Sequence, residues 1–252
     1  MNLIIFVFVF LLGMAIGSFL NVCIYRLPRR ESIIFPNSYC PQCKTRIKPY
    51  HNIPIFSYLL LGGRCRYCQS KIHWHYFVVE LVTPLLFVAV FRFYGLSLVS
   101  LKYFIFMSAG IIIFFIDAFH QIIPDKLSLP LIALGFFFTL LPQHDVGILS
   151  SLLGAGFGFV VFLAIALIFE KFTHKEALGG GDIKLIAAIG SFTGILGTIF
   201  TIIIASFIAF IFLLITKHDR TKYFSYGSFL VVGAIFYILF FQSLFGFYLN
   251  LF

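Results

Sequence analysis

Residues 178–184 read Leu-Gly-Gly-Gly-Asp-Ile-Lys, and a largely apolar run follows them to residue 216. One helical membrane crossing needs roughly 20 residues, so this run is too long for a single span. We expect it to break near Thr193-Gly194 into a short span and a longer one. A charge at membrane depth costs roughly 2.5–3.5 kcal/mol on insertion scales, so a carboxylate beside an apolar span needs a reason. Asp182 is therefore either an N-cap for the helix that follows the glycines or a functional group.

The composition predicts an all-α polytopic membrane protein. Hydrophobic residues make up 61% of the chain and charged residues only 11%, which excludes a water-soluble globule. The net charge of +9 comes from 18 Lys and Arg against 9 Asp and Glu. Because the basic residues gather in the loops that orient the helices, we expect the lipid bilayer as a partner and no nucleic acid.

The distribution of positive charge predicts the topology. Residues 3–24 are apolar, no basic residue precedes them, and Arg26 follows, so we expect an uncleaved first span with its N-terminus outside. Of the 18 basic side chains, all but Arg92 and Lys102 then fall on the inner side. We expect about eight transmembrane helices with both termini outside, the later seven at 76–94, 99–117, 126–142, 147–170, 183–194, 195–216 and 226–249.

Residues 26–75 form the long polar stretch of the chain and are placed in the cytoplasm by their basic charge. They contain two C-x-x-C pairs, Cys40 with Cys43 and Cys65 with Cys68. Four thiolates at this spacing are typical of a structural zinc site. Two disulfides are the alternative, but the cytoplasm is reducing. His73 and His75 are further potential ligands, although four cysteines already complete the coordination shell. We expect Cys23, inside the first span, to be a packed thiol.

Two carboxylates are predicted to lie at the same side of the bilayer. Asp117 closes the apolar segment that begins near residue 105, and Asp182 precedes the sixth span. An aspartic protease uses such a pair, because two adjacent anions repel, one carboxyl stays protonated, and the pair activates a water. A proton or cation relay and two unrelated caps remain alternatives. Asp125 follows Pro124 and is interpreted as a helix-start residue.

Several stretches together resemble the prepilin peptidase family of membrane aspartic proteases. These are Gly17 through Pro28, Asn52-Ile53-Pro54, Gly63-Arg64-Cys65, the two C-x-x-C pairs, Phe115-Ile116-Asp117, Ile123-Pro124-Asp125 and the G-x-G-D-x-K signature in Gly179–Lys184. The G-x-G-D sequence alone is a weak signal, but the ordered set covers nearly the whole chain. One departure concerns the turn before the last span. The family usually carries a Pro-Phe-Gly-Pro-like sequence, whereas this chain reads Phe224-Ser225-Tyr226-Gly227-Ser228 and keeps only Gly227.

The resemblance implies a bifunctional enzyme of type IV pilus, type II secretion and competence systems. Such an enzyme cleaves prepilin-like precursors after a short basic leader, commonly at Gly-Phe, at the cytoplasmic face of the bacterial inner membrane. It then N-methylates the new amine from S-adenosylmethionine. Carried over residue by residue, the catalytic aspartates are Asp117 and Asp182, the zinc ligands are Cys40, Cys43, Cys65 and Cys68, and methyl transfer is associated with Gly63.

The resemblance also divides the chain into three parts. Residues 1–25 form the first span, 26–75 the cytoplasmic zinc-binding domain associated with methyl transfer, and 76–252 the transmembrane peptidase domain. No glycine-rich S-adenosylmethionine fingerprint is visible in 26–75. Two alternatives from other classes are a membrane transporter or relay using paired carboxylates, and a zinc-bearing scaffold of a membrane assembly. A transporter or relay requires acidic residues in the middle of its spans. A zinc-bearing scaffold does not explain why Asp117 and Asp182 lie on the same side of the bilayer.

Overall fold

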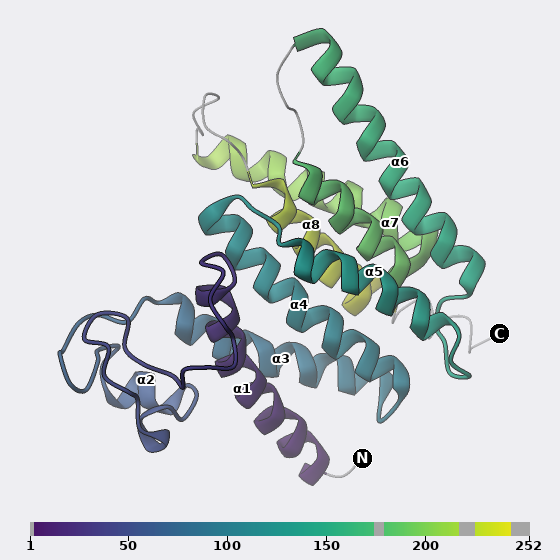
Figure 1. Ribbon diagram of the computed structural model, residues 1–252. Coiled ribbons are helices and arrows are strands. Elements are labelled where there is room, and N and C mark those ends of the chain that lie inside the picture. The colour runs from purple at the N-terminus through teal and green to yellow at the C-terminus, as the bar shows by residue number, and fades with distance from the viewer. Residues whose placement is uncertain (1–2, 174–178, 217–224, 243–252) are drawn as a thin grey trace. The chain divides into compact units, whose positions relative to one another are not determined.

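The computed structural model describes residues 3–173, 179–216 and 225–242 (Figure 1). Within these ranges the regular elements are helices, apart from two isolated β-bridges, as the composition predicts. The chain divides into two compact units, Met1–Arg92 and Phe93–Phe252. Some predictions fall on residues that the structure does not describe. One is the end of the last span, at 243–249. The others are the cytoplasmic positions predicted for four basic residues, Lys175, Lys217, Arg220 and Lys222.

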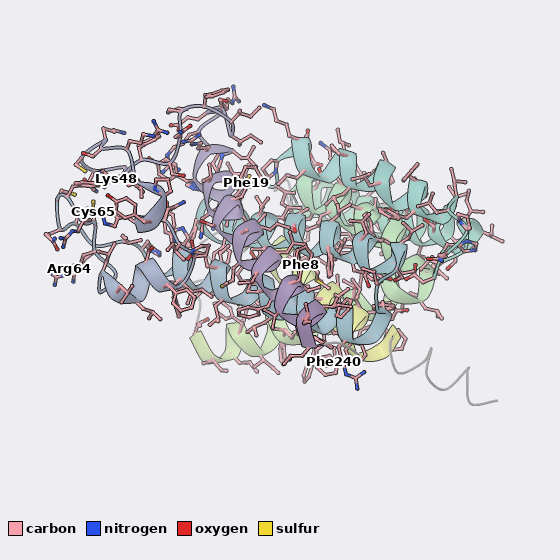
Figure 2. The ribbon with its side chains drawn as sticks, turned by 90° about the horizontal axis from the view of Figure 1, so that it is seen from below. Phe8, Phe19, Lys48, Arg64, Cys65 and Phe240 are labelled. Carbon is pink, nitrogen blue, oxygen red and sulfur yellow. The ribbon has the colours of Figure 1, made fainter. Side chains whose placement is uncertain are left out.

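The first unit consists of two long helices and the polar loop between them. Its elements are α1 (Leu3–Arg26), the short η1 (Pro49–His51), α2 (Phe56–Leu60) and α3 (His75–Tyr94). Helices α1 and α3 contact each other closely at Gly13, where an added Cβ would lie 2.9 Å from Pro84 Cβ. Small residues allow such close approach of apolar helices. Figure 2 shows Phe8 and Phe19 projecting from α1, and both side chains are exposed, as expected for a lipid-facing surface.

The second unit is a bundle of helices around α7 (Gly180–Thr216). The bundle also contains α4 (Leu98–His120), α5 (Asp125–Thr139), α6 (Ile148–Thr173), α8 (Tyr226–Phe236) and the π-helical η2 (Tyr237–Gln242). Helix α7 packs against α5, α6 and α8, while α4 packs against α5 and α8 (Figure 1). The N-terminal half of α7 is almost continuously buried. The bundle therefore brings the end of α4 and the beginnings of α7 and α8 together.

Helix α7 breaks where the length of its apolar run predicts a break. Gly194 has φ +71° and ψ −174°, which no residue of a continuous helix adopts. The N–H of the next residue, Ile195, donates to Ser150 Oγ of α6 at 3.3 Å, so a neighbouring helix satisfies a group that the break exposes.

Five of the described helices are long and apolar enough to cross a membrane, namely α1, α3, α4, α6 and α7. Helix α5 has 15 residues and α8 has 11, so neither meets that length. The chain is a multi-pass membrane protein.

One charge that the sequence placed on the outer side of the membrane is a buried helical residue. Lys102 lies within α4, 2% exposed, and its Nζ is 2.6 Å from Asp145 Oδ1 in the α5–α6 connection. The hydroxyl of Tyr103 donates to the other oxygen of Asp145. A buried charge persists only when it is paired and hydrogen-bonded, so the partner that sequence alone did not reveal explains the position of Lys102.

Candidate active site and metal centre

Asp117 lies in the last turn of α4 and is held by one residue of α8. The helix ends three residues later, where Gln121 adopts a left-handed conformation and its N–H donates to the carbonyl of Asp117 at 2.8 Å. Asp117 is only 4% exposed. Its Oδ2 accepts two hydrogen bonds from Ser228, one from the backbone N–H at 2.7 Å and one from Oγ at 3.0 Å. A buried carboxylate requires such donors.

Asp182 is the third residue of α7, within its first turn. Its backbone N–H donates to Gly179 O at 3.0 Å. The N-cap alternative requires the carboxylate to precede the helix, whereas Gly180 begins it. Asp182 Oδ1 is buried and has no hydrogen-bond partner among the described residues. An orphaned buried carboxylate oxygen is costly in a purely structural role, and it favours a functional one.

The two carboxylates converge on Gly227, at the start of α8. A Cβ added at this glycine would lie 3.0 Å from Asp117 Oδ2, 3.0 Å from Asp182 Oδ1 and 2.6 Å from Cδ1 of Ile123. The missing side chain therefore leaves room beside both carboxylates. The structure brings together the two aspartates that the sequence singled out, 65 residues apart along the chain by their numbers 117 and 182.

Asp125 plays a different part from the other two aspartates. It begins α5, as its position after Pro124 predicts, and its Oδ1 is 2.7 Å from Lys184 Nζ. Both side chains are partly exposed. The pair joins the first turns of α5 and α7, and an exposed ion pair of this kind contributes little to stability.

The four paired cysteines lie in two turns of the same construction. In each turn, the backbone N–H of the first cysteine donates to the carbonyl of the residue five positions later. The N–H of the residue four positions later donates to the carbonyl of that same cysteine. The residue after each pair, Lys44 or Gln69, has a positive φ of 58° or 57°. All four Sγ atoms lie within 4.8 Å of one another, and the five cysteines of the chain are free.

This cluster fits a tetrahedral metal ion. A zinc–sulfur distance of about 2.3 Å implies neighbouring sulfurs about 3.8 Å apart. The Sγ atoms of Cys40 and Cys68 are 3.9 Å apart. The Ser70 hydroxyl, 3.1 Å from Cys68 Sγ, lowers the pKa of that thiol to about 6, whereas burial raises the pKa of Cys65. Cys68 thus favours the thiolate, the form that binds metals.

The other candidate residues of this loop have separate positions. Cys23 is buried in α1, as expected for a packed thiol. The Nδ1 atoms of His73 and His75 lie 2.7 Å from each other, and neither histidine belongs to the cysteine cluster. Gly63 has φ +65°, and a Cβ there would lie 3.0 Å from the hydroxyl oxygen of Tyr58.

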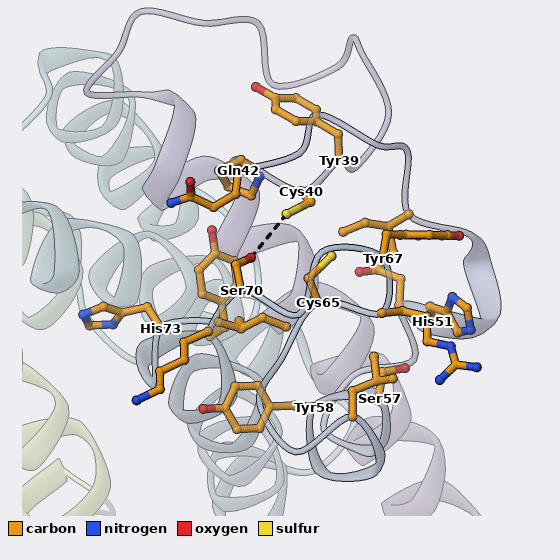
Figure 3. A pocket seen from close by; sticks show the side chains of 18 of the residues that line it. Tyr39, Cys40, Gln42, His51, Ser57, Tyr58, Cys65, Tyr67, Ser70 and His73 are labelled. Carbon is orange, nitrogen blue, oxygen red and sulfur yellow. Dashed lines mark hydrogen bonds between the residues drawn. The ribbon is translucent and has the colours of Figure 1, made fainter.

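A cavity of about 390 Å³ opens beside the cysteine cluster (Figure 3). Cys40, Cys65 and Ser70 line it on one side and Tyr58 on another. Gly63 is not among its lining residues, but it adjoins two of them, Tyr58 and Ile72, and the Ile72 N–H donates to Gly63 O at 2.7 Å. The volume lies within the range of small-molecule sites.

Sequence reasoning missed Ser228 as a partner of Asp117. The two residues are 111 positions apart, so no local pattern joins them. The sequence signal that could have pointed to Ser228 was its neighbour Gly227, which is the one residue kept from the family's usual turn.

These observations define a multi-pass helical membrane protein with a buried aspartate pair and a cysteine cluster able to hold a metal. Two family models match the chain. Residues 11–94 match the bacterial peptidase A24 N-terminal domain, and residues 104–214 match the type IV leader peptidase family. The chain belongs to the type IV leader peptidase family and is a peptidase of class A24.

Relatives cover most of the chain. A prepilin leader peptidase/N-methyltransferase of Neisseria gonorrhoeae is 36% identical over 247 residues, which are 88% of this chain and 86% of the relative. One of Aeromonas hydrophila is 33% identical over 273 residues, 97% of this chain and 94% of the relative. One of Vibrio cholerae is 35% identical over 214 residues, 80% of this chain and 82% of the relative. No solved structure matches the chain significantly.

Proposed function

We propose that this protein removes the leader peptide of prepilin-like precursors by aspartic proteolysis at Asp117 and Asp182, and then N-methylates the new N-terminal residue. The observation that carries the proteolytic part is the approach of both carboxylates to Gly227, with Ser228 holding one of them. The names of the relatives support both the substrate class and the second activity.

The unequal surroundings of the two aspartates suggest their roles. Two donors from Ser228 stabilise Asp117 as the carboxylate, since hydrogen bonds to charged acceptors are the strong ones. Two adjacent carboxyls share a proton, which leaves Asp182 as the protonated partner. In this mechanism Asp117 takes a proton from the attacking water. Asp182, through its orphaned Oδ1, donates to the carbonyl oxygen of the scissile peptide bond.

Zinc is the metal we assign to Cys40, Cys43, Cys65 and Cys68. Four sulfur ligands in a closed shell are typical of a structural zinc, which has no open position for catalysis. Together with the cavity beside it, this site makes 26–75 the methyl-transfer domain of the proposal. S-adenosylmethionine would supply the methyl group, and Gly63 would support the cavity wall. Residues 1–25 then serve as the first span and 76–252 as the peptidase domain, with Tyr76 and Glu80 at the start of α3 also bordering the methyl-transfer cavity.

Eight membrane crossings complete the proposal. The break at Gly194 supports two crossings in place of one long α7, and α5 and α8 supply two more if each short helix lies in a locally narrow part of the bilayer. The positive loops then face the cytoplasm, which places the aspartates at the cytoplasmic side of the bacterial inner membrane.

Substrate recognition follows from the charge of the chain. A basic leader is not attracted to the basic loop 26–75. The apolar helix of the precursor therefore provides the main binding energy by packing between spans.

The test of the proposed function is cleavage of a purified prepilin by the purified full-length protein in detergent, read by mass spectrometry. Asp117→Asn and Asp182→Asn each remove an essential acid or base while keeping the shape. We expect each to abolish cleavage without changing membrane insertion. Asp125→Asn is the matched control, because it makes the same chemical change in the exposed pair with Lys184.

Near-normal cleavage by either dyad variant would identify that aspartate as structural. Cleavage with no added methyl group by the wild-type protein, in the presence of S-adenosylmethionine, would remove the second activity from the proposal. Membership of a peptidase family leaves the transporter and scaffold alternatives without support.

A further inference from the structure

Two adjoining cavities occupy the first unit. The larger one, of about 390 Å³, is the cavity beside the cysteine cluster. A smaller chamber of about 80 Å³ shares with it Tyr25, Tyr76 and Glu80 among its walls. The chamber is also lined by Ser18 and Asn21 of α1, which belong to a sequence motif that neither the peptidase pair nor the cysteine cluster uses.

One hydrogen-bond acceptor of the small chamber lacks a donor. Asn21 is 2% exposed, and its Nδ2 donates to Tyr76 O at 3.0 Å. Its Oδ1 is buried and has no hydrogen-bond partner among the described residues. A buried acceptor without a donor is energetically costly, and it indicates a group that binds there.

Glu80 adds a carboxylate to the same chamber. One of its oxygens, Oε2, accepts the backbone N–H of Ile55 at 2.7 Å, and the side chains of Ser18 and Asn21 also hydrogen-bond to the carboxylate. Ile55 has φ 65° and ψ −56°, and Phe56 N donates to Pro54 O at 2.7 Å, which together make a strained γ-turn. A β-branched residue rarely adopts this conformation, so the turn and the carboxylate hold each other in place.

The charges around Glu80 single it out. Glu80 is the one carboxylate among the residues that line either cavity. The cationic Arg26 lines the small chamber, and Arg29, Arg66 and Lys71 line the larger one. Tyrosine rings also line this cavity and suit a cationic methyl donor. The acceptor pair Asn21 and Glu80 suits a compact group that is rich in donors and positively charged, and a primary ammonium has three N–H donors.

We propose that the chamber formed by Asn21 and Glu80 binds the new α-ammonium group of the cleaved substrate, and that Glu80 is the base for its methylation. The proposal rests on the methyltransferase function proposed above. The ammonium gives one proton to the Glu80 carboxylate and becomes a neutral amine. Its lone pair then attacks the methyl carbon of a sulfonium donor held in the larger cavity. The N–C bond forms, the C–S bond breaks with its electron pair passing to sulfur, and a thioether leaves.

The deciding variant is Glu80→Gln in the full-length protein. Glutamine keeps an oxygen that accepts the Ile55 N–H but cannot take a proton. At pH 7 we expect the initial rate of methylation of a mature pilin peptide to fall on the order of 100-fold or more, the range of general-base catalysis. Cleavage, zinc content and affinity for S-adenosylhomocysteine by calorimetry are expected to stay within about twofold. Glu31→Gln is the matched control, because Glu31 is exposed and lines neither cavity.

The pH dependence separates a base from a structural residue. A free α-amine has a pKa of about 7.7–8.0, so it loses its proton without help as the pH rises. Methylation by Glu80→Gln is therefore expected to recover strongly between pH 7 and pH 9 relative to the wild-type protein. A variant that is defective through misfolding would not recover in this way.

A second variant tests the binding half of the proposal. Asn21→Leu removes the unpartnered oxygen at nearly constant size, together with the Nδ2 donor to Tyr76 O. We expect it to abolish the preference of the protein for a pilin peptide with a free N-terminus over the same peptide N-acetylated, measured by fluorescence anisotropy. Wild-type rates in Glu80→Gln, or an unchanged preference in Asn21→Leu, would overturn the inference and leave the proposed function standing. Absence of methylation in the wild-type protein would overturn both.

Discussion

Ser228 gives Asp117 two donors from a single residue, and its one hydroxyl proton is shared between Asp117 Oδ2 at 3.0 Å and Phe114 O at 3.1 Å. The hydroxyl therefore links the carboxylate to the last turns of α4. The usual family turn has proline at this point, which has neither an N–H nor a hydroxyl. In this chain, Ser228 takes over the positioning of Asp117.

Ser228→Ala is expected to lower kcat/KM for leader cleavage roughly 10-fold, because one of two hydrogen bonds to a charged acceptor is lost while the backbone N–H remains. Ser228→Thr restores the hydroxyl and is expected to restore most of the rate. The measurement is the initial rate of cleavage with a purified prepilin. Equal rates for alanine and threonine would show that the hydroxyl does not act on Asp117.

Gly227 is expected to tolerate no side chain. A Cβ there would lie 2.6 Å from Ile123 Cδ1 and 3.0 Å from an oxygen of each aspartate, so Gly227→Ala would separate the pair. We expect cleavage to fall more than about 100-fold, since displacements of about 1 Å can have effects of that size. Gly156→Ala in α6 is the control, because an added Cβ meets nothing within 4 Å. Normal cleavage by Gly227→Ala would show that the two carboxylates need not approach this position.

At this scale the sequence predicted the approach of Asp117 and Asp182 to each other but not what holds them. Their positions at the ends of apolar segments, read with the positive-inside rule, place them on one side of the bilayer. The contact between Ser228 and Asp117 depends on how α8 docks against α4. Docking of two helices is a tertiary property that periodicity and composition do not encode.

Among the elements, helices α1, α3, α4 and α6 begin and end within a few residues of their predicted bounds, and the break of α7 is confirmed at Gly194. Long apolar runs and their breaks are local properties, so the sequence carries them. Lys102 lies within its predicted span, 99–117, but its burial was not predicted, because the compensating Asp145 comes from a distant connection. A buried ion pair is invisible when only one partner is considered.

The loop 26–75 is expected to depend on its metal. The paired cysteines bring together two turns that are otherwise joined only by chain, and a polar segment of about 50 residues has little core of its own. We expect one zinc per chain by metal analysis. We also expect chelation to accelerate proteolysis within 26–75, read by mass spectrometry, while the spans stay intact.

Two outcomes would contradict this prediction. One is purified protein without zinc, and the other is disulfides among the four cysteines after expression in a reducing cytoplasm. The geometry of free cysteines with sulfurs 3.9 Å apart argues for the metal.

For the whole molecule, the division into two compact units suggests two separable activities. Both aspartates lie in the second unit, and the cysteine cluster and its cavity lie in the first. We expect Cys40→Ser combined with Cys43→Ser to reduce methylation more than cleavage. Gly63→Val is expected to do the same by pushing Tyr58 into the cavity, because its Cβ would meet that ring in a backbone conformation with positive φ.

The measurement is the ratio of methylated to unmethylated mature pilin, alongside total cleavage. Gly62→Val serves as the control for Gly63→Val, since it shares the positive φ but meets nothing within 4 Å. Equal loss of both activities in each variant would argue that 26–75 is a structural lid for the peptidase.

The repeated cysteine turns have a consequence for how the protein matures in a cell. Each turn closes its own hydrogen bonds within a few residues, so we expect neither turn to need its partner to form. A bound ion then acts as a reversible crosslink, closing the chain between Cys43 and Cys65 and removing much of its loop entropy. Until the ion binds, we expect newly inserted copies to keep the loop 26–75 in an open conformation. If the proposed zinc is this ion, we expect the supply of cytosolic zinc to set the fraction of the enzyme pool that is competent, independently of how much of it is synthesised.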